Sequence, residues 1–349
     1  MSSNQWGKEL AIAQASVLRA ARLTKKVLSS VKELSKADSS PVTVADFAAQ
    51  ALLISILHAE FPQDDFVGEE DSAVLRGDEA LRNRVYELYS AARDEENTSS
   101  SIDEMLDFID RGGRGTGGGQ GRFWAMDPVD GTATFLTGEQ YAVSLALMED
   151  GREVLGAIVY PNVKLRGGRI VEDSVDEEGL GVMLSGVKNQ GAYVTWLPSW
   201  TGPYRTERLP KLQPPRRESL HIVDCDKNRP SHREVMKTVC EKLGAVFPGT
   251  DVWSSHIRYA SLIIGGGDFL VRIPSGPNSW SCIWDHAGAQ LIYREIGGRI
   301  TDLDGKEVDF SAGRYLCRSR GLVFAREEGL HAEVLRAARE VIGEDGFVS

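Results

Sequence analysis

Two aspartates three residues apart, Asp127 and Asp130, are the strongest chemical signal in the sequence. They flank Pro128 and Val129, follow an apolar stretch typical of a strand, and precede a glycine. Because proline fixes a turn, we expect both carboxylates and the carbonyl of Val129 to converge on one point instead of alternating across a sheet. Mg²⁺ takes oxygen ligands of this kind and keeps open positions for water and phosphate. Taken alone, the segment would also fit an aspartate-rich turn that caps a helix.

Other acidic residues strengthen the metal hypothesis. Glu69 and Glu70 end a separate strand-like segment, and Asp46 lies in a helix-like segment after Pro-Val-Thr. Asp285 stands at an expected helix start far down the chain. Each of these residues, taken singly, is more often a helix cap or a solvated charge than a ligand. Their joint occurrence with the aspartate pair favours a site for divalent cations.

Four segments carry a resemblance to a known family: SPVTVADFAAQ at 40–50, VGEED at 67–71, WAMDPVDGTATFLTGEQYAVSLAL at 124–147 and IWDHAGAQLIYREIGGRITDLDG at 283–305. In order and spacing they resemble the inositol monophosphatase superfamily, and within it the fungal and plant 3′(2′),5′-bisphosphate nucleotidases. The resemblance implies an α/β fold, a layered α-β-α-β-α sandwich of the inositol monophosphatase and fructose-1,6-bisphosphatase type. It also implies a phosphatase that uses two or three Mg²⁺ ions at a domain interface and is inhibited by lithium.

The resemblance assigns roles to the matching acidic residues. A first Mg²⁺ would bind Glu69, Asp127 and the carbonyl of Val129, and a second would bind Asp127, Asp130 and Asp285. One cation would lower the pKa of a water from about 15.7 toward neutrality, and the other would stabilise the leaving oxygen.

Further positions match residues that handle water and substrate. Asp46 and Thr132 would orient and deprotonate the attacking water, and the amides of Gly131 and Thr132 would receive phosphate at a helix N-terminus. For a second phosphate, WSSHIRYAS and LVRIP supply Ser255, Arg258 and Arg272. Arginine suits phosphate because its planar guanidinium donates two hydrogen bonds at once. Ordinary salt bridges would also account for both arginines.

The sequence departs from the family pattern at two places. ATFLTG at 133–138 has Thr134 where glycine is usual and Thr137 where arginine is usual, which affects the local loop but removes no metal ligand. CDKNRPSHRE at 225–234, the segment expected to face the adenine, matches poorly. His286 and the tryptophans Trp124, Trp280 and Trp284 are interpreted as packing residues.

The function expected from these residues is hydrolysis of the 3′-phosphate of adenosine 3′,5′-bisphosphate, and of its sulfated form. One alternative is the same chemistry on inositol monophosphate or another small phosphate ester. A second, from a different class, is a non-catalytic regulator that binds metal or nucleotide, which the altered 133–138 loop alone suggests.

The elements that must position these residues follow from apolar periodicity and turn signals. We expect helices at 10–31, 41–58, 231–243, 284–296 and 328–342, and strands at 66–70, 141–148, 154–160, 192–196, 220–223, 268–273 and 321–325. The glycine-rich stretch 111–121 predicts a flexible connector, because it lacks the pattern and the lysine of a phosphate-binding loop. Residues 90–104 are expected to be a loop. Five prolines at 197–219 mark a junction between an N-terminal domain, 1–212, that carries most metal ligands and a C-terminal domain, 213–349.

Composition limits the possible partners. The net charge of -11 argues against general nucleic-acid binding, which needs a basic surface. With no membrane-length apolar run and no secretory signal, we expect a cytoplasmic protein, a monomer or a homodimer, with no membrane partner. The four scattered cysteines favour free, mostly buried thiols.

Overall fold

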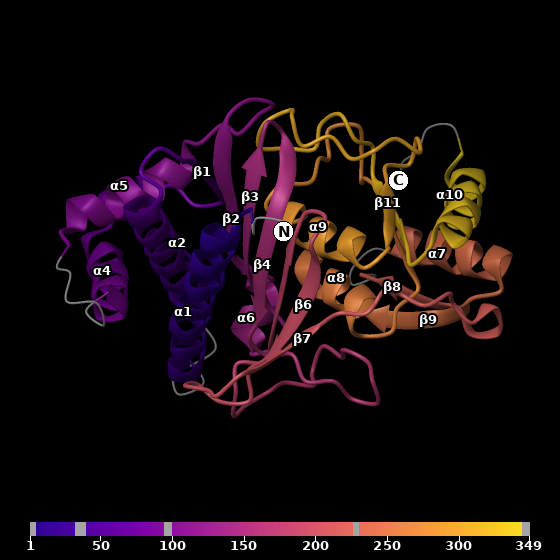
Figure 1. Cartoon of the computed structure of the whole chain (residues 1–349), viewed down its shortest axis with the longest axis horizontal. Helices are drawn as coiled ribbons and strands as arrows, with labels where there is room; N and C mark the ends of the chain where they lie inside the picture. Colours follow the sequence, from indigo (N-terminus) through magenta and orange to yellow (C-terminus); the bar gives the residue numbers. More distant parts are fainter. Residues whose placement is uncertain (1–4, 32–39, 94–99, 226–229, 344–349) are drawn as a thin grey trace.

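The computed structural model describes residues 5–31, 40–93, 100–225 and 230–343. Helices and sheets alternate in layers from one end of the molecule to the other (Figure 1). This order confirms the expected α-β-α-β-α sandwich. Within the described ranges, no helix combines the length and apolar character needed to cross a bilayer.

The helices are α1 (Gly7–Val31), α2 (Ser40–Glu60), α3 (Ala73–Gly77), α4 (Glu79–Arg93), α5 (Ile102–Gly113), α6 (Thr132–Thr137), α7 (Pro230–Leu243), α8 (Ser255–Ile263), α9 (Ala287–Glu295) and α10 (Glu328–Ile342). The strands are β1 (Asp65–Gly68), β2 (Arg122–Asp130), β3 (Ala142–Glu149), β4 (Arg152–Tyr160), β5 (Val182–Val187), β6 (Gly191–Trp196), β7 (Arg205–Arg208), β8 (His221–Asp224), β9 (Val246–Asp251), β10 (Phe269–Arg272), β11 (Arg299–Thr301) and β12 (Leu322–Ala325).

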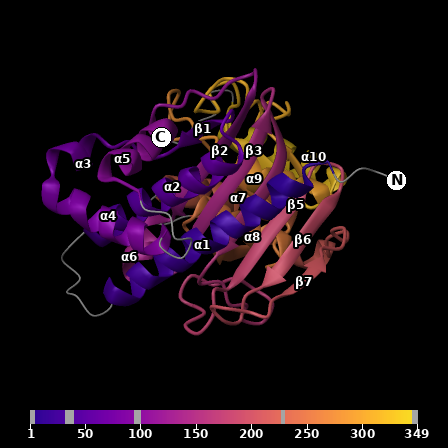
Figure 2. The same ribbon diagram turned by 60° about the vertical axis from the view of Figure 1, so that its left-hand side comes forward.

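The first sheet has seven strands in chain order, β1 to β7. β1 pairs in parallel with β2, and every later pair is antiparallel. On one face lie α1 and α2, which Figure 2 shows running across the strands. Both are long helices with dense apolar residues, and their alanines and leucines form one buried cluster with the sheet. Asp127 and Asp130 lie on β2 of this sheet, Glu69 and Glu70 directly follow β1, and Asp46 lies on α2.

The second sheet has five strands in the order β11-β12-β10-β8-β9. Between the two sheets lie α8 and α9, and their apolar faces join a cluster to which both sheets contribute. A separate cluster fills the space between the second sheet and the outer helices α7 and α10. The strands of the two sheets fall on either side of residues 209–220, and we retain the boundary at 212/213 as a prediction.

The helix α9 packs closely against the first sheet. Gly156 on β4 and Gly288 on α9 approach backbone to backbone, and a Cβ at Gly156 would lie 2.5 Å from the carbonyl oxygen of Gly288. Only glycine permits this approach. The helix that follows Asp285 is thus docked on the first sheet, although it belongs to the C-terminal part of the chain.

Most expected elements are present, with boundaries shifted by a few residues. Arg111–Gly113 form the last turn of α5, so this part of the expected connector at 111–121 is helical. The predicted junction at 197–219 includes an edge strand, β7. In the predicted loop at 90–104, α4 extends to Arg93, and residues 94–99 lie outside the described ranges. The 225–234 segment falls partly outside them, at 226–229.

The cysteines are free, as expected, but their burial differs from the prediction. Cys240 is buried, Cys225 and Cys282 are partly buried and Cys317 is exposed. The expectation of mostly buried thiols is therefore wrong, because apolar periodicity does not specify which side of a loop a cysteine occupies.

Candidate active site

Asp127 and Asp130 converge through an irregularity in a strand. Both belong to β2, and the pairing of β2 with β3 shifts register between them. In a regular strand, residues three apart point to opposite faces, so this bulge lets both carboxylates face the same space. The amide of Val129 donates to Oδ1 of Asp127 at 3.0 Å, which fixes the local turn of the chain. Convergence thus occurs as expected, but within an interrupted strand.

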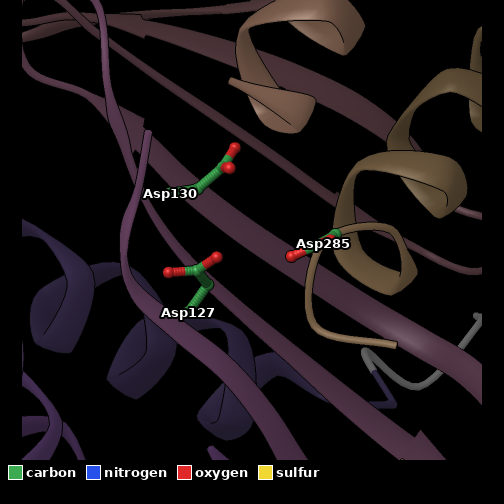
Figure 3. A group of neighbouring side chains, drawn as sticks. All are labelled: Asp127, Asp130 and Asp285. Carbon is green, nitrogen blue, oxygen red and sulfur yellow. The ribbon is translucent and has the colours of Figure 1, made fainter. Parts of the chain in front are cut away.

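Asp285 completes a group of three carboxylates. Oxygen atoms of Asp127, Asp130 and Asp285 lie within 4.8 Å of one another. Figure 3 shows the three side chains directed into one space, two from β2 and one from the loop before α9. The group brings together residues more than 150 positions apart in the sequence.

Mutual repulsion and burial shift the acidity of this group. Burial raises the pKa of Asp127 well above its usual value, and the charges of Glu69 and Asp130 raise it further. Burial also raises the pKa of Asp285 to about 7, with Asp130 adding to the shift and Arg272 opposing it. Carboxyl groups held this closely retain protons unless a cation compensates their charge. An all-oxygen set of this kind fits a hard divalent cation.

Glu69 lies at the rim of the group, directly after β1. It is within hydrogen-bonding reach of Asp127, and burial and the charge of Glu70 raise its pKa. Its side chain is nevertheless exposed, so solvent screens its part of the repulsion. Glu69 is not among the three carboxylates that share the 4.8 Å group.

Gln50, which we did not single out from the sequence, fixes the chain next to Glu69. Its side chain is fully buried, accepts from the amide of Glu70 at 3.0 Å and donates to the carbonyl of Glu70 at 2.6 Å. The sequence could have indicated this residue, because Gln50 follows Asp46 by four residues in ADFAAQ and therefore shares its helix face.

Asp46 lies on α2, buried to 5% exposure. Burial and the charges of Glu70 and Glu69 raise its pKa well above the usual value, which places it near the carboxylate group. Thr132 is the first residue of α6 and is exposed. No hydrogen bond joins Asp46 to Thr132 among the residues that the structure describes, and their roles remain predictions.

Gly131 forms the entry to α6 in a conformation that favours glycine. Its φ is 101°, and a Cβ there would lie 2.8 Å from Oγ1 of Thr134 and 3.1 Å from Cβ of Ser254. Thr134, the departure from the family pattern, is buried, and its hydroxyl donates to the carbonyl of Gln140 at 2.6 Å. The segment expected to be an altered loop at 133–138 is therefore mostly the helix α6, which Thr134 ties to Gln140.

The N-terminus of α8 binds Asp130. Oδ2 of Asp130 accepts from the hydroxyl of Ser254 at 2.5 Å and from the amide of His256 at 2.6 Å, and Oδ1 accepts from the amide of Ser255 at 3.3 Å. A carboxylate is favoured at this end of a helix. Asp130 thus joins the carboxylate group to the helix that carries the expected phosphate ligands.

Ser255, Arg258 and Arg272 form a second cluster next to the carboxylates. The hydroxyl of Ser255 accepts from Nη2 of Arg258 at 3.1 Å and from Nη1 of Arg272 at 3.3 Å. Within the described ranges, no carboxylate forms a salt bridge with either arginine, which contradicts the salt-bridge alternative. Burial lowers the pKa of Arg272, and the charge of Arg258 lowers it further. The charges of Asp285 and Asp130 oppose this shift, so the two guanidinium groups lie beside the carboxylate group without forming an ion pair with it among the described residues.

Both arginines line a cavity of about 250 Å³. This volume is near the lower end of the range of small-molecule sites, roughly 300 Å³. Asp224 and His232 lie on its wall, with Nε2 of His232 3.1 Å from Oδ1 of Asp224. Oδ2 of Asp224 is buried and has no hydrogen-bond partner among the residues that the structure describes. The cavity is thus lined both by the two arginines and by the paired Asp224 and His232.

The residues interpreted as packing residues differ among themselves. His286 is buried, and its Nδ1 lies 3.0 Å from the hydroxyl of Tyr259. Trp124 and Trp284 are buried, as expected. Trp280 is 49% exposed, which contradicts a core position for it and leaves a role as an interface anchor as a prediction.

Comparisons with known proteins identify relatives of the whole chain. Residues 6–342 match the model of the inositol monophosphatase family. The chain is 36% identical to the 3′(2′),5′-bisphosphate nucleotidase of Emericella nidulans, over 96% of this chain and 98% of the relative. It is 34% identical to the 3′,5′-bisphosphate nucleotidase 2 of Arabidopsis thaliana, over 97% and 98%.

Solved structures of low identity share the fold. Inositol monophosphatase II of Staphylococcus aureus resembles the chain with a TM-score of 0.59 at 18% identity, over 95% of this chain and 92% of that one. An inositol monophosphatase from Zymomonas mobilis gives a TM-score of 0.59 at 18% identity, over 97% and 100%. At this identity the similarity concerns the arrangement of the layers.

Proposed function

We propose a specific activity for this chain, which belongs to the inositol monophosphatase family. In this proposal it is a magnesium-dependent phosphomonoesterase that converts adenosine 3′,5′-bisphosphate to AMP and phosphate. The observation that carries this choice is the pair of arginines, Arg258 and Arg272, which has no carboxylate partner among the described residues. In a protein of net charge -11, an anion receives no general attraction and needs such a local site. A substrate with one phosphate at the carboxylates and another at the arginines uses both clusters.

The carboxylate end carries the reaction. Asp127, Asp130 and Asp285, with Glu69 and the carbonyl of Val129, hold the cations in this proposal. When bound, Mg²⁺ supplies a water of lowered pKa and neutralises charge on the phosphate. The number of ions, two or three, is part of the proposal.

Residues around this end orient the reactants. Asp46 accepts the proton of the attacking water; its burial on α2 and the charges of Glu70 and Glu69 that act on it support a position beside the cation ligands. Thr132 orients that water, and the amides of Gly131 and Thr132 donate to the phosphate oxygens.

The cavity beside the arginines receives the nucleoside. Asp224 on its wall offers a carboxylate that could accept from the exocyclic amino group of adenine in this proposal. Ser255 holds both guanidinium groups in place for the 5′-phosphate.

A substrate panel tests the proposal. Phosphate release is measured with Mg²⁺ from adenosine 3′,5′-bisphosphate, 3′-AMP and an inositol monophosphate. We expect kcat/KM to be at least about tenfold higher for the bisphosphate than for 3′-AMP, since one charged hydrogen bond contributes roughly 1.5–3 kcal/mol. Preference for the inositol ester would transfer the assignment to that alternative. Nucleotide binding without hydrolysis of any ester would indicate a regulator.

We also propose a cytoplasmic location, which the four free cysteines support because such thiols persist in a reducing compartment. Action as a monomer or a homodimer belongs to the same proposal.

A further inference from the structure

The side chain of Arg314 contacts two backbone segments and one aromatic ring around the carboxylate group. Its Nη2 donates to the carbonyl of Gly68 at 2.7 Å, and its Nη1 donates to the carbonyls of Gly112 and Gly115 at 3.1 and 2.8 Å. Its guanidinium carbon lies 4.7 Å from the centre of the Trp284 ring. No carboxylate in the described ranges pairs with it in a salt bridge. The side chain therefore acts on backbone and ring positions and not as an ordinary ion-pair partner.

Two of these contacts stand next to proposed metal ligands in the sequence. Gly68 directly precedes Glu69, and Trp284 directly precedes Asp285. The backbone of Arg314 joins the same region, because its carbonyl accepts from the amide of Ile283 at 3.0 Å. One residue thus contacts both the β1 end that leads to Glu69 and the loop that leads to Asp285.

The glycine-rich segment makes this contact possible. A Cβ at Gly115 would lie 1.6 Å from the carbonyl oxygen of Phe66, and a Cβ at Gly113 would lie 2.4 Å from that of Glu70. Neither position tolerates a side chain without movement of the backbone. Only glycines let the segment lie against residues 66–71, where its carbonyls and that of Gly68 face the same guanidinium.

We propose that Arg314 is the positioning residue that fixes Glu69 relative to Asp285, so that ligands from the two sequence halves hold two neighbouring cations that share Asp127. This inference rests on the metal site of the proposed function. Arginine is required because its planar group carries five N–H donors in a fixed arrangement and stacks on an aromatic ring. Lysine would bring the charge but only one nitrogen, which cannot reach all the acceptors.

The experiment measures cation binding without substrate. Mg²⁺ affinity is determined by calorimetry, and Mn²⁺ affinity by electron paramagnetic resonance, for the wild type, Arg314→Met and Arg314→Lys. We expect Arg314→Met to weaken binding about 10- to 100-fold, the usual range for partners that orient a ligand. Arg314→Lys should lose less cation affinity than Arg314→Met. The control is Arg318→Met, which removes an exposed arginine paired with Asp309 on the same segment and should leave affinity unchanged.

A double variant separates positioning from general stability. If Arg314 acts through Glu69, Arg314→Met should cost less than about threefold further affinity when Glu69→Gln is already present, because coupled residues are not additive. An equal loss in both backgrounds would overturn the proposal, as would wild-type affinity in Arg314→Met. If Arg314→Met does not fold in chelator, Arg314→Lys decides, and unchanged affinity there refutes positioning. These binding measurements do not depend on which ester is hydrolysed. If the protein does not hydrolyse adenosine 3′,5′-bisphosphate, the inference about Arg314 is therefore unaffected. Absence of cation binding by the wild type would instead overturn the proposed metal site.

Discussion

Replacing Arg258 by alanine should remove the preference for a second phosphate. Arg258 and Arg272 both donate to Ser255 and have no carboxylate partner in the described part of the chain. In the proposed complex, each forms charged hydrogen bonds with the 5′-phosphate. Arg258 is the better first target, because the pKa of Asp285 depends more on Arg272 than on Arg258. Its removal therefore disturbs the carboxylate group less.

The magnitude follows from the hydrogen bonds that the substitution removes. One charged hydrogen bond contributes roughly 1.5–3 kcal/mol, so kcat/KM for adenosine 3′,5′-bisphosphate should fall about ten- to a hundredfold. For 3′-AMP, which lacks only the 5′-phosphate, the expected change is less than about threefold. Arg258→Lys keeps the charge without the planar pair of donors. Its kcat/KM for the bisphosphate should lie between those of the wild type and the alanine variant.

The assay is initial-rate phosphate release on the two substrates under identical Mg²⁺ concentrations. The ratio of the two kcat/KM values cancels any general loss of active protein. Equal losses on both substrates would refute the reasoning, since the arginine would then support the fold or the carboxylate group and not the second phosphate.

The remaining predictions concern the carboxylate end. Asp46→Asn should lower kcat by roughly a hundredfold or more while Mg²⁺ affinity by calorimetry stays unchanged, the scale expected for a lost general base; near-normal turnover would make Asp46 an ordinary helix residue. Asp127→Ala should weaken Mg²⁺ binding in the same measurement, and excess chelator should abolish activity, whereas full activity in chelator contradicts the mechanism. The thermal stability of the metal-free wild type, relative to that of metal-free Asp285→Asn, should fall as pH rises from about 4 to about 7. Raised carboxyl pKa values, about 7 for Asp285, mean that the folded state binds more protons than the unfolded state in this window. Melting of both proteins in chelator against pH checks this, and a rising or flat difference would refute it. Lithium titration of the activity should show inhibition, and insensitivity would weaken the subfamily assignment alone.

Local patterns predicted many of the helices and strands because period and turn signals act over short distances, whereas the layered arrangement was expected from the family resemblance. The hairpin of β3 and β4 and the long helices α1 and α2 lie close to the expected positions. The convergence of Asp127 and Asp130 was predicted from proline, which does stand at the irregular part of β2. The convergence takes the form of a bulge within β2. This bulge depends on the pairing of β2 with β3, and a local sequence pattern contains no information about that pairing.

Contacts between distant segments were not predictable from the sequence. Arg314 reaches Gly68 across 246 positions, and nothing near Arg314 indicates that partner. The absence of counter-ions around Arg258 and Arg272 in the described ranges likewise depends on which carboxylates the fold brings near. Its residue type alone suggested that Trp280 packs in the core or at an interface. Its exposure depends on the loop that carries it, which the residue type does not specify.

The close contact between Gly156 and Gly288 affects what a cut in the chain can do. Asp285 is covalently part of the C-terminal portion, yet α9 after it is docked on the first sheet and contributes to the cluster between the sheets. Proteolytic cleavage in the proline-rich stretch before β8 would therefore leave two fragments that remain associated. Asp285 would stay beside Asp127 in such a nicked molecule, because packing and not the peptide connection holds it there.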